Sequence, residues 1–269
     1  KTFMLLDIAY RSACQRRRTA FFGCGDMTER QMAIRFLSRF ACHPFRSTGK
    51  DLSWPCEVKW PLRIRRPPKG SADPCKIHWD TREFKAPLGS KKAWESCQRI
   101  MKEKIKSKAD FLRLSCHPNF TISAEGIKAT IQRWILDDWI PDVVVIDYAD
   151  ILAPPAGLGK KEERDQINTT WMQLRALSQE LHCLVVTATQ AKATAYAKRT
   201  TDRRDFSGDK RKLAHATGVF GINVTSEEKE RGQMRLNWHV LRERDYSPRR
   251  CLHVATCLPV ANPIVRSVL

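Results

Sequence analysis

The chain has 269 residues, of which 42% are hydrophobic and 29% are charged. This composition is enough for one sizeable hydrophobic core, and it excludes an intrinsically disordered chain. The longest apolar run, around Val143 to Ile146, is far shorter than the roughly 18 residues that a membrane-spanning helix needs, and no membrane partner is expected.

The charge balance is strongly basic. The 48 Lys and Arg residues exceed the 29 Asp and Glu residues by 19, which makes the surface attractive to polyanions. Residues 43–108 contain 17 basic and 7 acidic residues, and residues 192–212 contain 8 basic and 3 acidic residues. This clustering favours a nucleic acid as partner over a basic surface that only provides solubility. The ten cysteines lie mostly in apolar patterns, which indicates free thiols in a reducing compartment.

The N-terminal part predicts helices on either side of a strand. Residues 3–15 are mostly apolar and lack Pro and Gly, which favours a helix, and the apolar run 19–24 favours a strand. Thr28 and Gln31 form a capping box at the start of a second helix. From His43 to about Leu88, seven prolines predict irregular structure, and a basic helical pattern follows in residues 91–108.

From Ile122 the pattern becomes regular again. A helix is expected up to Pro141, followed by the run 142–147, whose β-branched residues are typical of a strand buried on both faces. A loop (154–161), a helix (167–181), a strand (183–188), a basic loop (192–209) and strands at 234–241 and 250–259 follow. Strands that alternate with helices predict an α/β fold with a mostly parallel sheet, which binds ligands beyond the carboxyl ends of its strands.

Lys1, Thr2 and Asp147 have the chemistry of a nucleotide site. Lys-Thr before an apolar helix matches the end of a phosphate-binding loop, G-x-x-x-x-G-K-[ST], in which the Lys contacts phosphates and the Thr hydroxyl binds Mg²⁺. Asp147, at the end of its strand, would face the same ion. By itself each pattern is common, because a Lys-Thr pair can be without function and Asp147 can simply begin a turn.

Four further side chains could act on a phosphoryl group. Asp26 follows the first strand and could polarise a water molecule, or it could only complement a helix dipole. Gln190 could sense a γ-phosphate, or it could be an exposed strand end. Arg242 and Arg244 share a face at the end of the strand 234–241, which suits two cations aimed at a phosphate, although an exposed basic edge would have the same pattern.

In this order, these motifs resemble the C-terminal ATPase domain of the DnaB-type replicative helicases, a RecA-like P-loop NTPase. The resemblance lies in the segments 1–9, 22–28, 143–148, 174–190 and 242–244, and it covers most of the chain outside residues 43–110. Asp26 stands where the family has Glu. The Walker A glycines would precede Lys1, so we expect the chain to be truncated within that loop.

The resemblance implies an ATP- and Mg²⁺-dependent motor that forms a hexameric ring around single-stranded DNA, in the cytoplasm of a bacterial or phage-infected cell. Lys1, Thr2 and Asp147 would then hold Mg²⁺ and ATP, Asp26 and Gln190 would act in hydrolysis, and Arg242 and Arg244 would reach the ATP of a neighbouring subunit. The ATPase core would comprise residues 1–42 and 110–269, with residues 43–109 as an insertion.

Two loops at the ligand edge of the sheet are expected to contact DNA through their basic residues, which are Lys160, Lys161, Arg164, Lys192, Lys198, Arg199, Arg203 and Arg204. The alternative is that both loops are only solvated. Two other functions also remain open: a RecA/RadA-type recombinase ATPase that forms open filaments, and a non-hydrolysing DNA-binding or assembly module on a degenerate ATPase scaffold.

The expected insertion contains a candidate zinc site. Cys75-x-x-His78 has the spacing of a ligand pair, and Cys56 and Cys97 could complete a tetrahedral Zn²⁺ site. Ordinary free thiols are the alternative. Trp54, Trp60, Trp79 and Trp94 could stack on bases or could pack the insertion together.

Overall fold

The computed structural model describes residues 1–25, 27–45, 54–67, 75–107, 109–157, 162–206, 210–248 and 250–269. These residues form two compact units. Unit 1 comprises Lys1–Ile34, Gln98–Lys192 and Arg204–Ala216, and unit 2 comprises Arg35–Cys97, Ala193–Arg203 and Thr217–Leu269. In the part of the chain described, no helix combines the length and the apolar character needed to cross a membrane.

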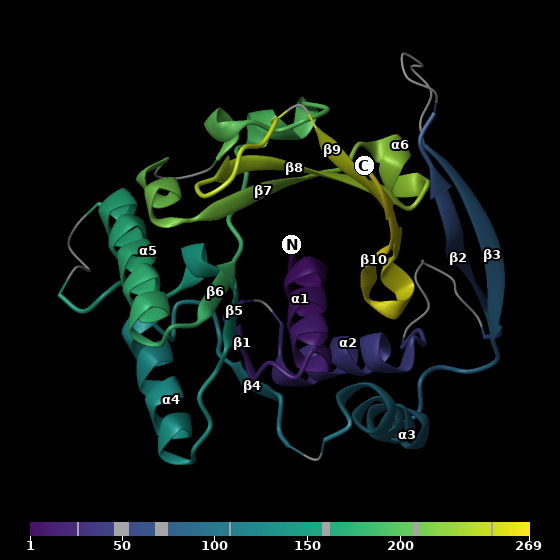
Figure 1. The fold of residues 1–269 in the computed structure, drawn as a ribbon, viewed down its shortest axis with the longest axis horizontal. Helices are drawn as coiled ribbons and strands as arrows, with labels where there is room; N and C mark the ends of the chain where they lie inside the picture. The colour runs from purple at the N-terminus through teal and green to yellow at the C-terminus, as the bar shows by residue number, and fades with distance from the viewer. Residues whose placement is uncertain are drawn as a thin grey trace. The chain divides into compact units, whose positions relative to one another are not determined.

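Unit 1 is built on a parallel sheet (Figure 1). Its strands follow the order β4-β1-β5-β6, with bounds Leu112–Cys116, Thr19–Gly23, Val143–Asp147 and Leu184–Thr187. All five residues of β1 and of β5 are buried, as the uninterrupted apolar runs predict. The predicted α/β class with a mostly parallel central sheet is therefore confirmed.

Helices cover both faces of this sheet. Helix α1 (Thr2–Cys14) contacts β1 and β5, while α4 (Ala124–Leu136) and α5 (Glu163–Glu180) pack together on the opposite side (Figure 1). The main hydrophobic core joins Phe22 and Ile146 of the strands to Ile131 of α4 and Leu177 of α5. Each such fully buried side chain contributes about 1.5–3 kcal/mol. Because alternate residues of each strand point to opposite faces of the sheet, the strands are held between the two layers of helices.

The other helical segments of unit 1 include two that continue into stretches assigned to unit 2. Helix α2 (Glu29–Ala41) begins after the capping box, in which the Gln31 backbone N–H donates to Thr28 Oγ1 over 3.3 Å. A π-helical turn (Met101–Ile105) precedes β4, and 3₁₀ turns follow at Ala149–Ile151, Arg203–Asp205 and Lys210–His215. The turn after β5 and the last of these turns are joined by a hydrogen bond from Lys212 to Asp150.

Unit 2 contains an antiparallel sheet in the order β10-β9-β8-β7. The bounds are Asn262–Val268 for β10, Cys251–Cys257 for β9, Gln233–Leu241 for β8 and Gly218–Asn223 for β7. Helix α6 (Ser226–Glu230) connects β7 to β8, and 3₁₀ turns lie at Ala193–Ala197 and Leu258–Val260. In β8 the two predicted faces are present, but the polar side chains of Arg235, Asn237 and His239 are buried, whereas Trp238 is exposed.

The prediction of irregular structure between His43 and Leu88 is wrong for two stretches. Strands β2 (Cys56–Arg65) and β3 (Lys76–Phe84) form an antiparallel hairpin, followed by helix α3 (Ser90–Ile100). Pro61 is tolerated because the register shifts between Pro61 and Arg63, and prolines within sheets are confined to edges and bulges. Residues 35–97 belong to the same compact unit as the C-terminal antiparallel sheet.

Candidate active site

The carboxyl ends of the parallel strands in unit 1 bring several predicted site residues together. Asp147 is the last residue of β5 and is only 5% exposed. Its backbone oxygen accepts from the Cys24 N–H, just beyond β1, over 2.9 Å. The Thr187 hydroxyl at the end of β6 donates to the Ile146 oxygen and accepts from the Ala149 N–H, each over 2.9 Å. These bonds fix the direction of the backbone on both sides of Asp147.

Tyr148 connects the start of α1 to the segment after β6. The Lys1 Nζ lies 4.0 Å from the centroid of the Tyr148 ring. On the other side, Gln190 Nε2 donates to the Tyr148 hydroxyl over 2.6 Å. Lys1 and Gln190, predicted on separate grounds, are thus held on one tyrosine that directly follows Asp147.

The electrostatics of Lys1 place its ammonium among carboxylates. Burial lowers the pKa of Lys1, while the charges of Asp150 and Asp147 act in the opposite direction. Lys1 is also the N-cap of α1, and Thr2 is the first residue of that helix. The first N–H groups of a helix attract anions. This end of unit 1 therefore offers a cation, helix N–H groups, a hydroxyl and a buried carboxylate within one region.

A buried polar network lies directly behind this region. Lys212 is 0% exposed, and its Nζ donates to Asp150 Oδ2 over 3.1 Å and to Thr189 Oγ1. The Thr189 hydroxyl in turn donates to Asp150, and Trp171 Nε1 donates to Asp150 Oδ1 over 3.2 Å. Since Asp150 lies three residues after Asp147 and Thr189 directly precedes Gln190, the network braces both site segments.

Sequence reasoning missed this network. Lys212 belongs to a basic run that reads as a solvated surface, and Asp150 follows the strand without a motif of its own. No pattern in the sequence singles out either residue, because the pairing joins segments 62 positions apart.

The basic loop expected to contact DNA begins and ends beside Gln190. Ala191 forms an antiparallel bridge with Phe206, and the Lys192 N–H donates to the Asp205 oxygen over 2.7 Å. Both roots of the loop are therefore fixed within unit 1, one residue away from Gln190.

Within unit 2, the segment 199–203 is tied to the polar face of β7 and β8. Arg235 forms an ion pair with Glu228 at 2.5 Å and donates to Thr200 Oγ1 over 2.8 Å. The Thr201 N–H donates to Asn223 Oδ1 over 2.7 Å. Burial raises the pKa of Glu228, but the hydrogen bonds from Arg235 and the Thr225 N–H, together with the positive charges of Arg235 and Arg199, outweigh burial and lower this pKa below its ordinary value. These contacts supply partners for polar groups that would otherwise be buried at a cost.

The remaining predicted DNA-binding residues differ in their surroundings. Arg203 Nε donates to the His239 oxygen over 2.5 Å, and its guanidinium also donates to the Tyr246 hydroxyl, so Arg203 has a structural role in unit 2. Lys198 forms an ion pair with Asp202 at 3.6 Å, and Arg164 forms one with Glu162 at 2.7 Å. Lys192, Arg199 and Arg204 have exposed side chains. Lys160 and Lys161 lie outside the described residues.

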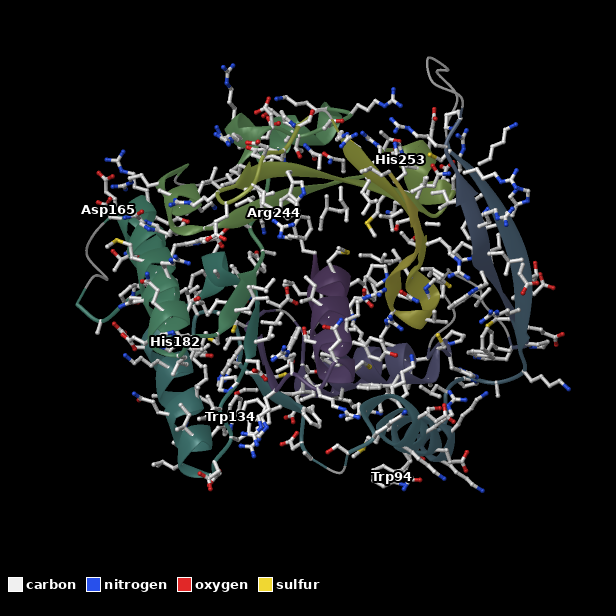
Figure 2. The ribbon with its side chains drawn as sticks, in the orientation of Figure 1. Trp94, Trp134, Asp165, His182, Arg244 and His253 are labelled. Carbon is white, nitrogen blue, oxygen red and sulfur yellow. The ribbon has the colours of Figure 1, made fainter. Side chains whose placement is uncertain are left out.

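The structure does not place Asp26, Arg242 or Arg244 beside Asp147. Asp26 lies outside the described residues. Arg242 and Arg244 follow β8 in unit 2, where the Arg242 N–H donates to the Thr217 oxygen over 3.0 Å, and Figure 2 shows Arg244 in the connection to β9. Their relation to a nucleotide stays a prediction.

The expected zinc site is not supported. In the residues described, no group of three or more His, Cys, Asp or Glu side chains is arranged to hold a metal ion. Cys56 and Cys75 lie in two different hydrophobic clusters, and Cys97 is on α3. Burial raises the pKa of all three thiols. The described positions of these cysteines and His78 therefore do not support the expected zinc site.

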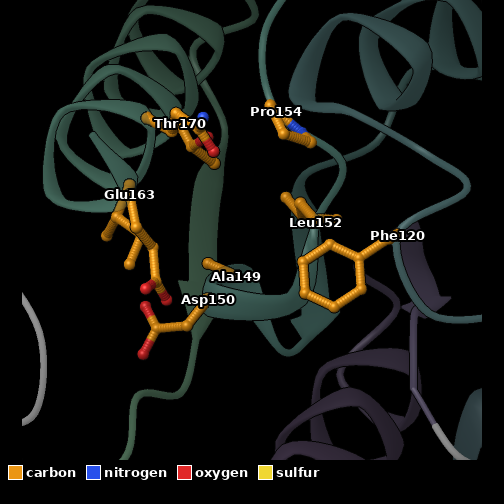
Figure 3. Close-up of a pocket in the computed structure, with 9 residues that line it drawn as sticks. Phe120, Ala149, Asp150, Leu152, Pro154, Glu163 and Thr170 are labelled. Carbon is orange, nitrogen blue, oxygen red and sulfur yellow. The ribbon is translucent and has the colours of Figure 1, made fainter. Parts of the chain in front are cut away.

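A small cavity lies between α5 and the turn after β5 (Figure 3). It has a volume of about 30 Å³, and its lining includes Phe120, Leu152 and Thr170. Figure 3 shows the carboxylates of Asp150 and Glu163 turned toward one another at its edge. This volume holds about one or two water molecules and cannot hold a nucleotide.

Known structures share this architecture. Over 97% of the chain, one match, described as an ATPase domain, has a TM-score of 0.68 at 12% identity, and 79% of that chain is covered. The fold is that of DnaB-like helicase ATPase domains. A second match is a DnaB-like replicative helicase, which is described together with its interactions with primase. It has a TM-score of 0.65 at 11% identity, and the match covers 97% of this chain and 55% of the helicase chain.

These matches confirm the predicted RecA-like fold. By sequence alone, no family model and no curated protein matches the chain. At 11–12% identity the similarity concerns the fold. The chemistry must therefore be argued from the residues at the end of the parallel sheet.

Proposed function

We propose that the chain is the ATP-hydrolysing motor domain of a DNA helicase that moves along single-stranded DNA. The observation that supports this most directly is the arrangement of Lys1, Tyr148 and Gln190 beside the buried Asp147. A parallel sheet whose strand ends carry a lysine, a carboxylate and an amide is suited to a nucleoside triphosphate. The similarity to helicase ATPase domains supports the same class of enzyme.

The residues at this edge fit Mg²⁺ with ATP. Mg²⁺ binds through one or two protein oxygens together with phosphate oxygens and water, so a dedicated cluster of acidic residues is not needed. The Thr2 hydroxyl and the Asp147 carboxylate are ligands of that kind. When bound, Mg²⁺ neutralises phosphate charge during transfer. Lys1 would contact the phosphates, while the N–H groups at the start of α1 would stabilise their negative charge.

Gln190 would report the state of the phosphates to the DNA-binding loop. Its amide is held by the Tyr148 hydroxyl, and the loop begins one residue later, where Ala191 pairs with Phe206. A small displacement of Gln190 would therefore act on the root of the loop. Lys192, Arg199 and Arg204 would contact the DNA backbone from this loop.

Arg242 and Arg244 would complete the site of a neighbouring subunit. Two guanidiniums supplied by another copy stabilise the charge that develops on the transferred phosphoryl group. Hydrolysis would then require an oligomer, and a closed hexameric ring is the arrangement that we propose.

ATP hydrolysis by the full gene product, with and without single-stranded DNA, tests the proposal. Asp147→Ala should abolish the DNA-stimulated rate, whereas Asp137→Ala, which removes an exposed carboxylate after α4, should leave it unchanged. An unchanged rate in Asp147→Ala removes this residue from the metal role.

The same material separates the other functions. Failure to bind ATP would favour the non-hydrolysing DNA-binding module. Hydrolysis together with open filaments on single-stranded DNA, seen by electron microscopy, would favour a recombinase over a ring-forming helicase.

A further inference from the structure

The two ends of the β2-β3 hairpin pack against the rest of unit 2 through opposite faces, since the half-buried positions of β3 change from Ile77 and Trp79 to Arg82 and Phe84. Cys56 and Val58 pack against Cys257 and Val260, and Ile64 packs with Ala255. Hydrogen bonds fix the backbone, since Arg266 Nε donates to the Leu62 oxygen and Gln233 Nε2 donates to the Cys75 oxygen, both over 2.8 Å. The hairpin is thus supported at both ends, and at each end the side turned away from the rest of unit 2 meets the solvent.

The exposed face is basic at one end. The register places Arg63 opposite His78 and Arg65 opposite Lys76, and all four side chains are exposed. At the other end of the hairpin, Glu57 lies opposite Glu83. Like charges directly opposite one another destabilise a sheet. Charged residues can also protect a sheet edge against aggregation, but charge of either sign does this. Such protection therefore does not explain why residues of the same sign lie opposite one another.

The spacing of this basic patch (Arg63, Arg65, Lys76 and His78) suits an extended polyanion. Residues two apart on a strand are separated by about 7 Å, and opposite residues by about 5 Å. Side chains on one face project roughly in parallel, so they do not converge on a single small anion. Within the described residues, none of the four forms an ion pair with a carboxylate, which leaves the charges of Arg63, Arg65 and Lys76 available to a ligand.

We propose that the basic patch on the β2-β3 hairpin binds the phosphodiester backbone of a nucleic acid. It forms a second contact surface, carried by a different element from the loop of residues 192–204. The proposal does not depend on ATP hydrolysis, since it rests on the hairpin alone. Bound phosphates would neutralise the opposing cations and so remove the repulsion between them.

The test is binding of the full chain, without ATP, to fluorescent single-stranded DNA, duplex DNA and single-stranded RNA at several salt concentrations. The variant combines Arg63→Thr, Arg65→Thr and Lys76→Thr, since Thr is compatible with a strand. The control combines Lys91→Gln, Lys92→Gln and Arg99→Gln on the exposed face of α3, which removes the same charge.

For the preferred nucleic acid, the hairpin variant should bind at least about tenfold more weakly, with a salt slope smaller by about 2, as expected for three lost backbone contacts. Its melting temperature should stay the same or rise, because the repulsion is removed. The control should bind within about twofold of the unchanged protein. The proposal is overturned if both variants bind alike, or if weaker binding comes with a lower melting temperature. Arg63→Lys with Arg65→Lys should retain the affinity.

Discussion

The Lys212 ammonium and the Asp150 carboxylate form a buried ion pair with an Nζ to Oδ2 distance of 3.1 Å. Both belong to unit 1, and the exposed fractions of their side chains are 1% and 13%. Buried pairs of this kind are costly to break, because one charge is then left without compensation.

Lys212→Met should therefore lower the free energy of unfolding by about 3–5 kcal/mol. The adjacent Arg211 also forms an ion pair, with Asp165, but it is exposed, so Arg211→Met should cost less than about 1 kcal/mol. Urea denaturation of both variants measures the difference. Adding Asp150→Leu to Lys212→Met should recover part of the loss, and equal effects of the two single substitutions would contradict the prediction.

Tyr148→Phe tests the hold on Gln190. The substitution keeps the ring beneath Lys1 but removes the hydroxyl that accepts from Gln190. We expect kcat for ATP to fall about tenfold with little change in KM, because a positioning contact is lost rather than a binding contact. Tyr10→Phe, which removes a hydroxyl bonded to Lys104, is the matched control. Equal kcat values for Tyr148→Phe and the unchanged protein would refute the assigned role.

The assignment of Arg242 and Arg244 can be tested by mixing variants. An Arg242→Ala/Arg244→Ala chain and an Asp147→Ala chain should each be inactive alone. If the arginines act on a neighbour's nucleotide, mixed oligomers contain some intact sites, so the mixture should regain activity. ATPase assays across mixing ratios measure this, and a mixture as inactive as its components argues against action between subunits.

Acid should weaken unit 2 through Glu228. Its pKa is lowered in the folded state, so its contribution is present above the ordinary value near 4.5 and is lost as the pH falls through the folded pKa. Glu228→Gln should lower the free energy of unfolding by about 1–3 kcal/mol at pH 7. Between about pH 5 and pH 3, the stability of this variant should decline less than that of the unchanged protein, because this range spans about one unit on either side of the ordinary Glu pKa. Glu227→Gln, at an exposed neighbour, should retain the decline; if Glu228→Gln retains it too, the pairing is not its source.

Thiol labelling should follow burial. Burial raises the pKa of Cys24 and Cys257 to about 12 and that of Cys183 to about 11. Under native conditions near pH 8, about the pKa of a free thiol, these three should react with maleimide far more slowly than the half-buried Cys14 and Cys251. Peptide mapping by mass spectrometry gives the order, and rapid labelling of Cys24 would show that the core opens readily. EDTA should leave the melting temperature unchanged.

The sequence predicted β1, β5 and β6 of the parallel sheet because their apolar runs are continuous, and β1 and β5 are fully buried, whereas the half-buried β4 was missed. Asp147 ends such a run and Gln190 follows another, so the sequence predicts both at the edge where parallel strands end, while their roles stay predictions. The hairpin was missed because Pro61 interrupts its alternation at a bulge and because half of its residues are polar. The Lys212 network was also not predictable, since its members come from distant segments and only the fold brings them together.

The buried polar face of β8 holds the segment 199–203 against unit 2 through hydrogen bonds. Arg235 and Asn223 find their partners in Thr200 and Thr201, so shortening this loop would strip hydrogen bonds from a sheet that lies far from it in the sequence. A loop taken from a protein with the same fold could therefore not be grafted here alone. It would have to be exchanged together with the strands that hold it.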